Sequence, residues 1–225
     1  MLRQAIWLLL LVCLPRWAAA QWRLGPRGGV GFPLLQEGVF RPTANGTSIL
    51  GFHVGIDVEY QFGQPAGPDL SLGAYLARLG GEVLTSEVHH NRGTATLFSA
   101  YFYAFQCPLM VGYHGSLSQL PLYIAIGLQP AWGLWGKQKT APDIPHKPIA
   151  WQEDMRRFNL SIAFRTGVEL PRWPVQIGIY MDYGLLDLTP GEGHLVSVAY
   201  GFSFAYLVPL VRTSPPHKPK QPVAQ

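Results

Sequence analysis

Large apolar residues alternate with small or polar ones along three consecutive segments, RFNLSIAFRTGVEL, PVQIGIYMDYGLL and HLVSVAYGFSFAYL. A period of two places successive side chains on opposite faces of a β-sheet. Segments of about ten residues with this period, separated by turn residues, are typical of transmembrane β-barrels. The apolar face predicted for the three segments consists of Phe158, Leu160, Ile162, Phe164, Val168, Leu170, Val175, Ile177, Ile179, Met181, Tyr183, Leu185, Val196, Val198, Tyr200, Phe202, Phe204 and Tyr206.

The opposite face of these segments is made mainly of Gly, Ala and Ser with scattered charges. Such a face would make a poor water-exposed surface, but it suits the narrow interior of a small closed barrel. We therefore expect the apolar face to contact lipid, whereas a soluble barrel with an apolar ligand would need the reverse arrangement. Aromatic girdles mark the two membrane interfaces of such barrels, and the aromatic residues predicted there are Tyr60, Phe62, Trp132, Trp135, Trp173 and Tyr206.

Five further strands are predicted upstream, at about residues 28–35, 50–62, 70–84, 96–113 and 122–135. In the third of these the alternation assigns no facing beyond Ala77. Together with the three segments above they make eight, an even number that lets a sheet close without an edge. The predicted fold is all-β, an eight-stranded antiparallel up-and-down transmembrane β-barrel.

The connections favour an orientation with both chain ends in the periplasm. Long external loops are expected at residues 36–49, 85–95 and 136–156, with a short one at 189–193, and short periplasmic turns at 63–69, 114–121 and 171–174. The loop KQKTAPDIPHKPIAWQEDMRR is the longest irregular piece. It is either the binding surface, since barrels carry specificity on loops, or a solvated variable segment.

The two ends of the chain lack the alternating pattern of the predicted strands. Residues 1–20 combine Arg3, an apolar run and Ala18-Ala19-Ala20, which predicts a secretory signal peptide cut after Ala20. A lipoprotein signal retaining Cys13 is disfavoured by the bulky Val12 before it. The barrel domain is expected at residues 21–208, followed by a Pro- and Lys-rich disordered tail at 209–225.

Composition adds few limits. Removal of the predicted signal takes away Arg3 and Arg16 and leaves the mature chain with a net charge of only about +2. This small and dispersed charge argues against a nucleic-acid partner. Cys107 would be the lone cysteine of the mature chain, so no internal disulfide is expected.

Several charged residues of the predicted strands point into the lumen: His53, Asp57, Glu59, Arg165, Glu169 and Asp182. Buried charges must pair with one another or bind water. We expect Arg165 and the carboxylates to form a structural polar network, with a conduction path or ligand site as the alternative. Eight strands leave an interior that side chains just fill, which disfavours an open pore.

Two groups of residues at the predicted external rim could in principle support catalysis. One is Ser86, Glu87, His89 and His90, and the other is Asp187, His194 and Ser197. A Ser–His–carboxylate set needs hydrogen-bonded geometry that proximity in sequence does not establish. The adjacent His89 and His90 lack the converging ligands of a zinc site. We therefore predict no catalytic, cofactor-binding or metal-binding residues.

The segments GFHVGIDVEYQF, FQCPLMVGY, RRFNLSIAFRTGVEL and IGIYMDYGLLDLTP together resemble strands of the PorT-like outer-membrane β-barrel family of Bacteroidetes. The chain departs from that pattern at Gln106 and Cys107, and in the tail that follows the last strand. The resemblance implies a cell outer membrane location with contacts to outer-membrane lipid and the barrel-assembly machinery.

From the filled lumen and the variable loops we expect a non-enzymatic structural or interaction role in the cell envelope, and the resemblance adds an accessory part in protein secretion. Envelope or secretion proteins would be the partners, since PorT-like members are associated with type IX secretion. The alternative from a different class is an outer-membrane enzyme that acts on lipid or peptide at the extracellular rim.

Overall fold

Every regular element of the described residues is a β-strand. The computed structural model describes residues 21–37, 46–62, 66–87, 94–118, 120–139, 145–190 and 195–210. Within these ranges there is no helix long and apolar enough to span a bilayer. The strands are β1 (Gln21–Gly31), β2 (Leu34–Glu37), β3 (Gly46–Thr47), β4 (Gly51–Gln61), β5 (Gly67–Glu87), β6 (Thr94–Gln106), β7 (Leu109–Leu117), β8 (Leu120–Lys139), β9 (Lys147–Pro148), β10 (Phe158–Glu169), β11 (Val175–Gly184), β12 (Leu195–Tyr206) and β13 (Val208–Pro209).

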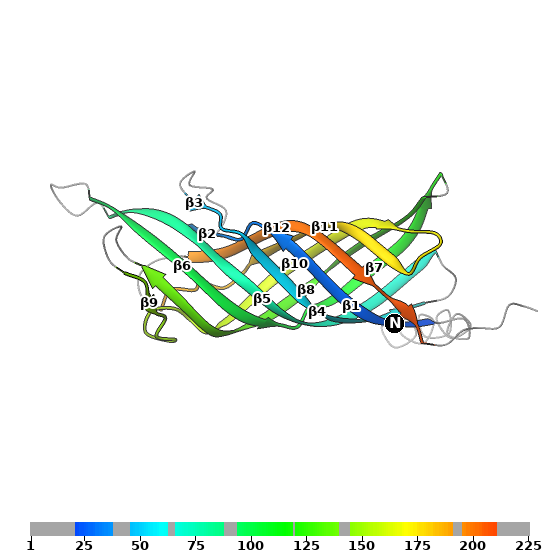
Figure 1. Ribbon diagram of the computed structural model, residues 1–225, viewed down its shortest axis with the longest axis horizontal. Coiled ribbons are helices and arrows are strands. Elements are labelled where there is room, and N and C mark those ends of the chain that lie inside the picture. Colours follow the sequence, from blue (N-terminus) through cyan, green and yellow to red (C-terminus); the bar gives the residue numbers. More distant parts are fainter. Residues whose placement is uncertain are drawn as a thin grey trace, which may run out of the picture.

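These strands form one closed antiparallel barrel (Figure 1). Four short strands continue longer ones: β2 extends β1, β3 extends β4, β7 continues β6, and β13 extends β12. Apart from β9, which pairs with β8, the remaining eight strands follow one another in chain order. β1 closes the barrel against β12 from Arg27↔Ala205 to Gly31↔Gly201. The predicted eight-stranded antiparallel barrel is confirmed.

Most of the early strands are longer than predicted. β1 begins at Gln21 rather than near residue 28, and β5 already includes Gly67, Pro68 and Asp69. β7 continues through His114 to Leu117, where a turn was expected. Gly and Pro in these stretches predicted breaks, but antiparallel ladders tolerate Pro where its missing N–H faces away from the partner strand. Strand pairing also continues to Pro209, the first residue of the predicted tail. The tail from residue 211 onward lies outside the described residues.

Apolar side chains point outward over the whole circumference. Ile126 is 57% exposed and Phe202 64% exposed, whereas their strand neighbours Gly127 and Ser203 are at most partly accessible. In β5 buried and accessible residues alternate as far as Leu79, after which Gly80, with a φ of +136°, and Gly81 are both buried. The inward side chains of Leu79 and Val83 are apolar.

Three residues of the predicted lipid face are buried instead: Val175, Val196 and Val198 are 9%, 0% and 7% exposed. The end of β12 that carries Val196 and Val198 is hydrogen-bonded to the segment after β11, where the Leu188 N–H donates to the Leu195 carbonyl over 2.7 Å.

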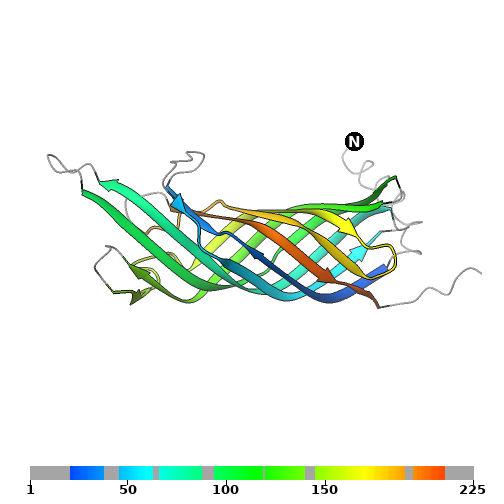
Figure 2. The same ribbon diagram turned by 45° about the horizontal axis from the view of Figure 1, so that its top comes forward.

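The six predicted interface aromatics lie at two opposite ends of the barrel. We call these the terminal end, where β1 begins and β12 ends, and the loop end, where β5 ends and β6 begins (Figure 2). Tyr60, Phe62, Trp173 and Tyr206 lie at the terminal end, and Trp132 and Trp135 at the loop end. Neighbouring rings contact them, with centroids 4.7 Å apart for Trp22–Tyr60, 4.9 Å for Tyr103–Trp135 and 4.8 Å for Trp132–Phe158.

The longest predicted loop is partly folded into the barrel mouth. β8 extends to Lys139, β9 pairs with it, and the following turn returns Ile149 and Met155 to a buried apolar cluster. A Cβ at Gly133 would meet the ring of Trp151 at 2.7 Å, so glycine is what lets this turn approach the barrel wall. The Ala150 N–H, 2.8 Å from Asp154 Oδ2, stabilises the turn and holds the pKa of that carboxyl below its usual range.

The outward-facing apolar surface predicts a depth-dependent penalty for charge. Leu128 and Leu120 lie on the same face of β8 and are 49% and 45% exposed, but Leu128 is mid-strand and Leu120 is at the terminal end. Leu128→Arg should lower the free energy of unfolding by about 2–4 kcal/mol, and Leu120→Arg by about 0–1 kcal/mol. Urea unfolding of the refolded protein in lipid vesicles measures both. Equal, small effects would mean that this face contacts water.

Candidate functional site

The lumen next to the terminal end contains a cluster of ionisable side chains from five strands, Arg23, Glu59, Asp69, His114 and Glu169. Arg23 Nη1 lies 3.0 Å from Glu59 Oε1, and its Nη2 pairs with Glu169. His114 Nε2 lies 3.2 Å from Glu59 Oε1 and 3.4 Å from Asp69 Oδ1. Three carboxylates thus converge on one guanidinium and one imidazole.

A second cluster fills the middle of the lumen around Asp57. Arg27 and Tyr75 donate to opposite oxygens of this carboxylate, and Arg165 Nη1 lies 3.5 Å from Oδ2. The Arg165 guanidinium also lies 5.3 Å from the centre of the Tyr75 ring. The carboxylate of Asp57 is therefore compensated from β1, β5 and β10 at once, although it is 1% exposed.

Gln176 joins the two clusters. Its Oε1 accepts from Arg27 Nη2 over 2.7 Å, and its Nε2 donates to Glu59 Oε2 over 3.3 Å and to Glu169 Oε1 over 3.1 Å. Because Gln176 comes from β11, the network crosses the lumen and links strands on opposite sides of the barrel.

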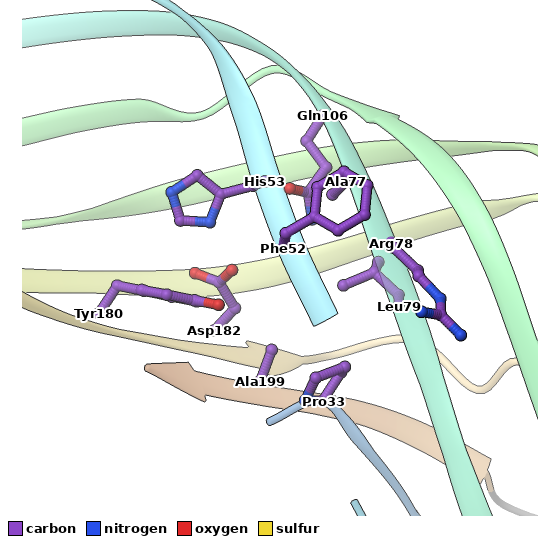
Figure 3. Close-up of a pocket in the computed structure, with 10 residues that line it drawn as sticks. All are labelled: Pro33, Phe52, His53, Ala77, Arg78, Leu79, Gln106, Tyr180, Asp182 and Ala199. Atoms are coloured by element: carbon purple, nitrogen blue, oxygen red, sulfur yellow. The ribbon is translucent and has the colours of Figure 1, made fainter. Parts of the chain in front are cut away.

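A third polar group lies nearer the loop end, around a small cavity of about 10 Å³ (Figure 3). The ring centroids of His53 and Tyr180 are 4.6 Å apart in an edge-on arrangement, and Gln129 Nε2 donates to Asp182 Oδ2 over 2.8 Å. A cavity of this size holds about one water molecule. Figure 3 shows His53, Tyr180 and Asp182 together, with the Arg78 guanidinium directed away from them.

Beyond this cavity the lumen becomes apolar. Residues of β2, β5, β6 and β12 pack with the turn after β9 into a buried cluster that includes Leu35, Leu79, Phe102, Met155 and Leu195. The lumen is thus charged at the terminal end and in the middle, polar around the small cavity, and apolar at the loop end.

The structure brings the six predicted lumen residues inside the barrel but divides them. Glu59 and Glu169 belong to the terminal-end cluster, Asp57 and Arg165 to the central one, and His53 and Asp182 line the small cavity. Among the described residues, the ion pair of Arg165 is with Asp57 rather than with Glu169 or Asp182.

Four charged lumen residues were missed by the sequence reasoning. Arg23 and Arg27 precede the predicted first strand, Asp69 precedes the predicted third, and His114 was assigned to a turn. Each keeps the period-two register of its strand, so extending the alternation by a few residues would have found them. Without them the predicted network had one arginine against four carboxylates.

Among the described residues, the two rim groups considered for catalysis do not form a Ser–His–carboxylate set. Asp187 Oδ1 accepts from the Thr189 N–H over 2.9 Å and the Leu195 N–H over 2.9 Å, and so holds its own loop. The Ser197 hydroxyl is buried and accepts from Asn159 Nδ2 over 2.8 Å. His89, His90 and His194 lie outside the described residues, as do the side chains of Ser86 and Glu87.

Residues 17–189 match the family described as the outer membrane protein beta-barrel domain. The chain belongs to this family. Membership in this barrel family implies an outer-membrane location, in agreement with the apolar outer face described above. The match does not distinguish a subtype, so the PorT-like subtype rests on the resemblance alone.

Several solved structures are similar to this barrel. Ail of Yersinia pestis, solved with the heparin analogue sucrose octasulfate, is 12% identical with a TM-score of 0.43, over 83% of this chain and 99% of that one. Neisserial surface protein A is 9% identical with a TM-score of 0.43, over 81% and 96%. OprG of Pseudomonas aeruginosa is 10% identical with a TM-score of 0.36, over 84% and 95%. No curated protein matches the sequence.

The central cluster predicts a strong dependence of stability on one negative charge. Asp57→Asn leaves Arg27 and Arg165 buried without a carboxylate, so the free energy of unfolding should fall by about 3–5 kcal/mol. Lys147→Ala is the control, since it removes an exposed pair with Asp154 and should change stability by less than about 1 kcal/mol. Urea titrations in lipid vesicles compare the two. A loss below about 1 kcal/mol for Asp57→Asn would contradict the interpretation.

Proposed function

We propose that this barrel is a non-enzymatic outer-membrane protein with a structural or interaction role in the cell envelope. The observation that carries the proposal is the filled lumen, which is crossed by ion pairs and closed by apolar residues at the loop end. Such an interior stabilises the wall and leaves the surface for contacts. The outer face would contact lipid, and the barrel-assembly machinery would insert the protein into the membrane.

In this proposal the terminal end faces the periplasm and the loop end faces outward. Support comes from the longer connections, which gather at the loop end, as barrels of this architecture have short periplasmic turns. Lys137, Lys147, Arg156 and Arg157 are exposed there and would meet anionic headgroups or a protein partner. An accessory part in protein secretion is the narrower form of the proposal and rests on the PorT-like resemblance.

A structural lumen predicts that the protein does not conduct ions. Refolded barrels, checked for closure by the mobility shift between unboiled and boiled samples, should give no unitary current steps in planar lipid bilayers. A general porin in the same bilayers controls for the sensitivity of the recording. Reproducible steps from the closed barrel would favour the conduction path over the structural network.

A non-enzymatic role predicts that substitution of the rim residues changes neither lipid A nor the cleavage of outer-membrane proteins. A strain lacking this protein, and strains complemented with the wild type or with His194→Ala and Ser197→Ala together, should have identical lipid A mass spectra and identical outer-membrane proteolysis. Heat-shifted mobility confirms that the variant is folded. A product that is present with the wild type and absent from both other strains would establish the enzyme alternative.

A further inference from the structure

Three side chains of the terminal-end cluster have the arrangement of metal ligands. One carboxylate oxygen each from Glu59 and Asp69 and one nitrogen of His114 all lie within 4.8 Å of one another. His114 Nε2 is 3.2 Å from Glu59 Oε1 and 3.4 Å from Asp69 Oδ1. In a tetrahedral zinc site with ligand bonds near 2.0–2.1 Å, neighbouring donor atoms are about 3.3–3.4 Å apart.

The second nitrogen of the same imidazole lies beside a carboxylate that could hold it, although the two make no hydrogen bond in this structure. His114 Nδ1 lies 3.3 Å from Glu169 Oε2. Metal-ligating histidines usually direct their other ring N–H to a carboxylate, which fixes the tautomer and leaves the first nitrogen free to bind. The imidazole is 3% exposed, so its orientation is set by these contacts and by stacking on Tyr123 at 6.2 Å between centroids.

The charge of the cluster calls for an additional cation. Glu59, Asp69 and Glu169 bring three carboxylates, and Arg23 is the guanidinium that pairs with two of them, Glu59 and Glu169. Asp69 pairs with His114 rather than with Arg23. Buried carboxylates in excess of their cations are strongly destabilising unless a proton or a metal ion compensates them.

The strands build this site from adjacent walls. β5 pairs with β4 on one side and with β7 on the other, which brings Glu59, Asp69 and His114 to the same level. Asp69 is directly opposite Gly112, where a Cβ would lie 2.8 Å from Asp69 Oδ2. Glycine at position 112 therefore leaves the space that the carboxylate occupies.

The cluster can be reached from solvent. A cavity of about 210 Å³ opens at the terminal end and is lined by Arg23 and Glu169 of the cluster, together with Gln21, Gln61, Pro174, Leu207 and Pro209. An ion entering there reaches Glu169 and Arg23, which lie beside His114 and Glu59 of the cluster.

We propose that Glu59, Asp69 and His114 bind a divalent transition-metal ion, with Zn²⁺ as the best fit, and that Glu169 positions the His114 ring. One imidazole nitrogen with two carboxylate oxygens suits Zn²⁺ and its first-row neighbours, whereas Ca²⁺ and Mg²⁺ take oxygen ligands alone. Glu59 keeps its hydrogen bond from Arg23 on binding, since a carboxylate oxygen has two lone pairs. Asp69 and His114 had been assigned to turns, which is why the sequence predicted no metal ligands.

The test uses the full chain purified from outer membranes without a histidine tag and stripped with EDTA. Isothermal titration with ZnCl₂ should give one saturable site per chain, and substitution by Co²⁺ should give the strong visible absorption of a four-coordinate ion. His114→Gln should weaken Zn²⁺ binding by at least about 100-fold, and Glu169→Gln by about 10- to 100-fold.

His53→Gln is the matched control, because it removes another buried lumen imidazole outside the proposed site and should leave Zn²⁺ affinity unchanged. Asp69→Asn repeats the test if His114→Gln does not give the heat-dependent mobility shift of a closed barrel. Absence of a saturable site in the wild type overturns the proposal and leaves a protonated His114 as the compensating cation. Equal affinity in the wild type and the ligand variants overturns it as well.

Discussion

Compensation of buried charge is the constraint on which the rest of this barrel depends. The lumen is too narrow to hydrate Asp57 and Glu59, so guanidinium groups must reach them from other walls. Arg27 comes from the neighbouring β1, but Arg165 comes from β10 across the lumen. A slip of one residue between β1 and β4 would turn Arg23 and Arg27 toward lipid, so the ion pairs also specify the register in which the barrel closes.

The small residues of the inner face follow from the same constraint. Arginine, tyrosine and glutamine side chains can cross the lumen only if the positions opposite them are Gly, Ala or Ser. Gly73, for example, lies where a Cβ would meet Asp57 Oδ1 at 2.6 Å. The outer face has no such restriction, and it carries large apolar and aromatic residues because lipid is its solvent. A single period-two pattern thus specifies both the polar, filled lumen and the lipid-facing outer surface.

Much of this could be predicted from the sequence, because the alternation is a local property. The alternation predicts the eight strands and most of their facing, and it identifies the inward side chains of β4, β10 and β11. Arg23 and His114 were not predicted because the first strand was expected only from about residue 28 and His114 was expected in a turn, whereas the ladder continues through both stretches. The burial of Val196 and the return of Met155 into the mouth depend on packing between distant segments, which no local period records.

The asymmetry of the lumen then limits how the two ends can work. At the loop end, Phe102, Leu195 and the turn carrying Met155 exclude water, so this end can act only through its outer surface. At the terminal end, the cavity beside Arg23 and Glu169 keeps the ionic cluster within reach of small ions. Small ions can therefore reach the cluster from the side of the chain termini, whereas the proposed contacts with macromolecules would use the opposite side. In this proposal the barrel keeps the two kinds of contact apart, and no pore has to connect them.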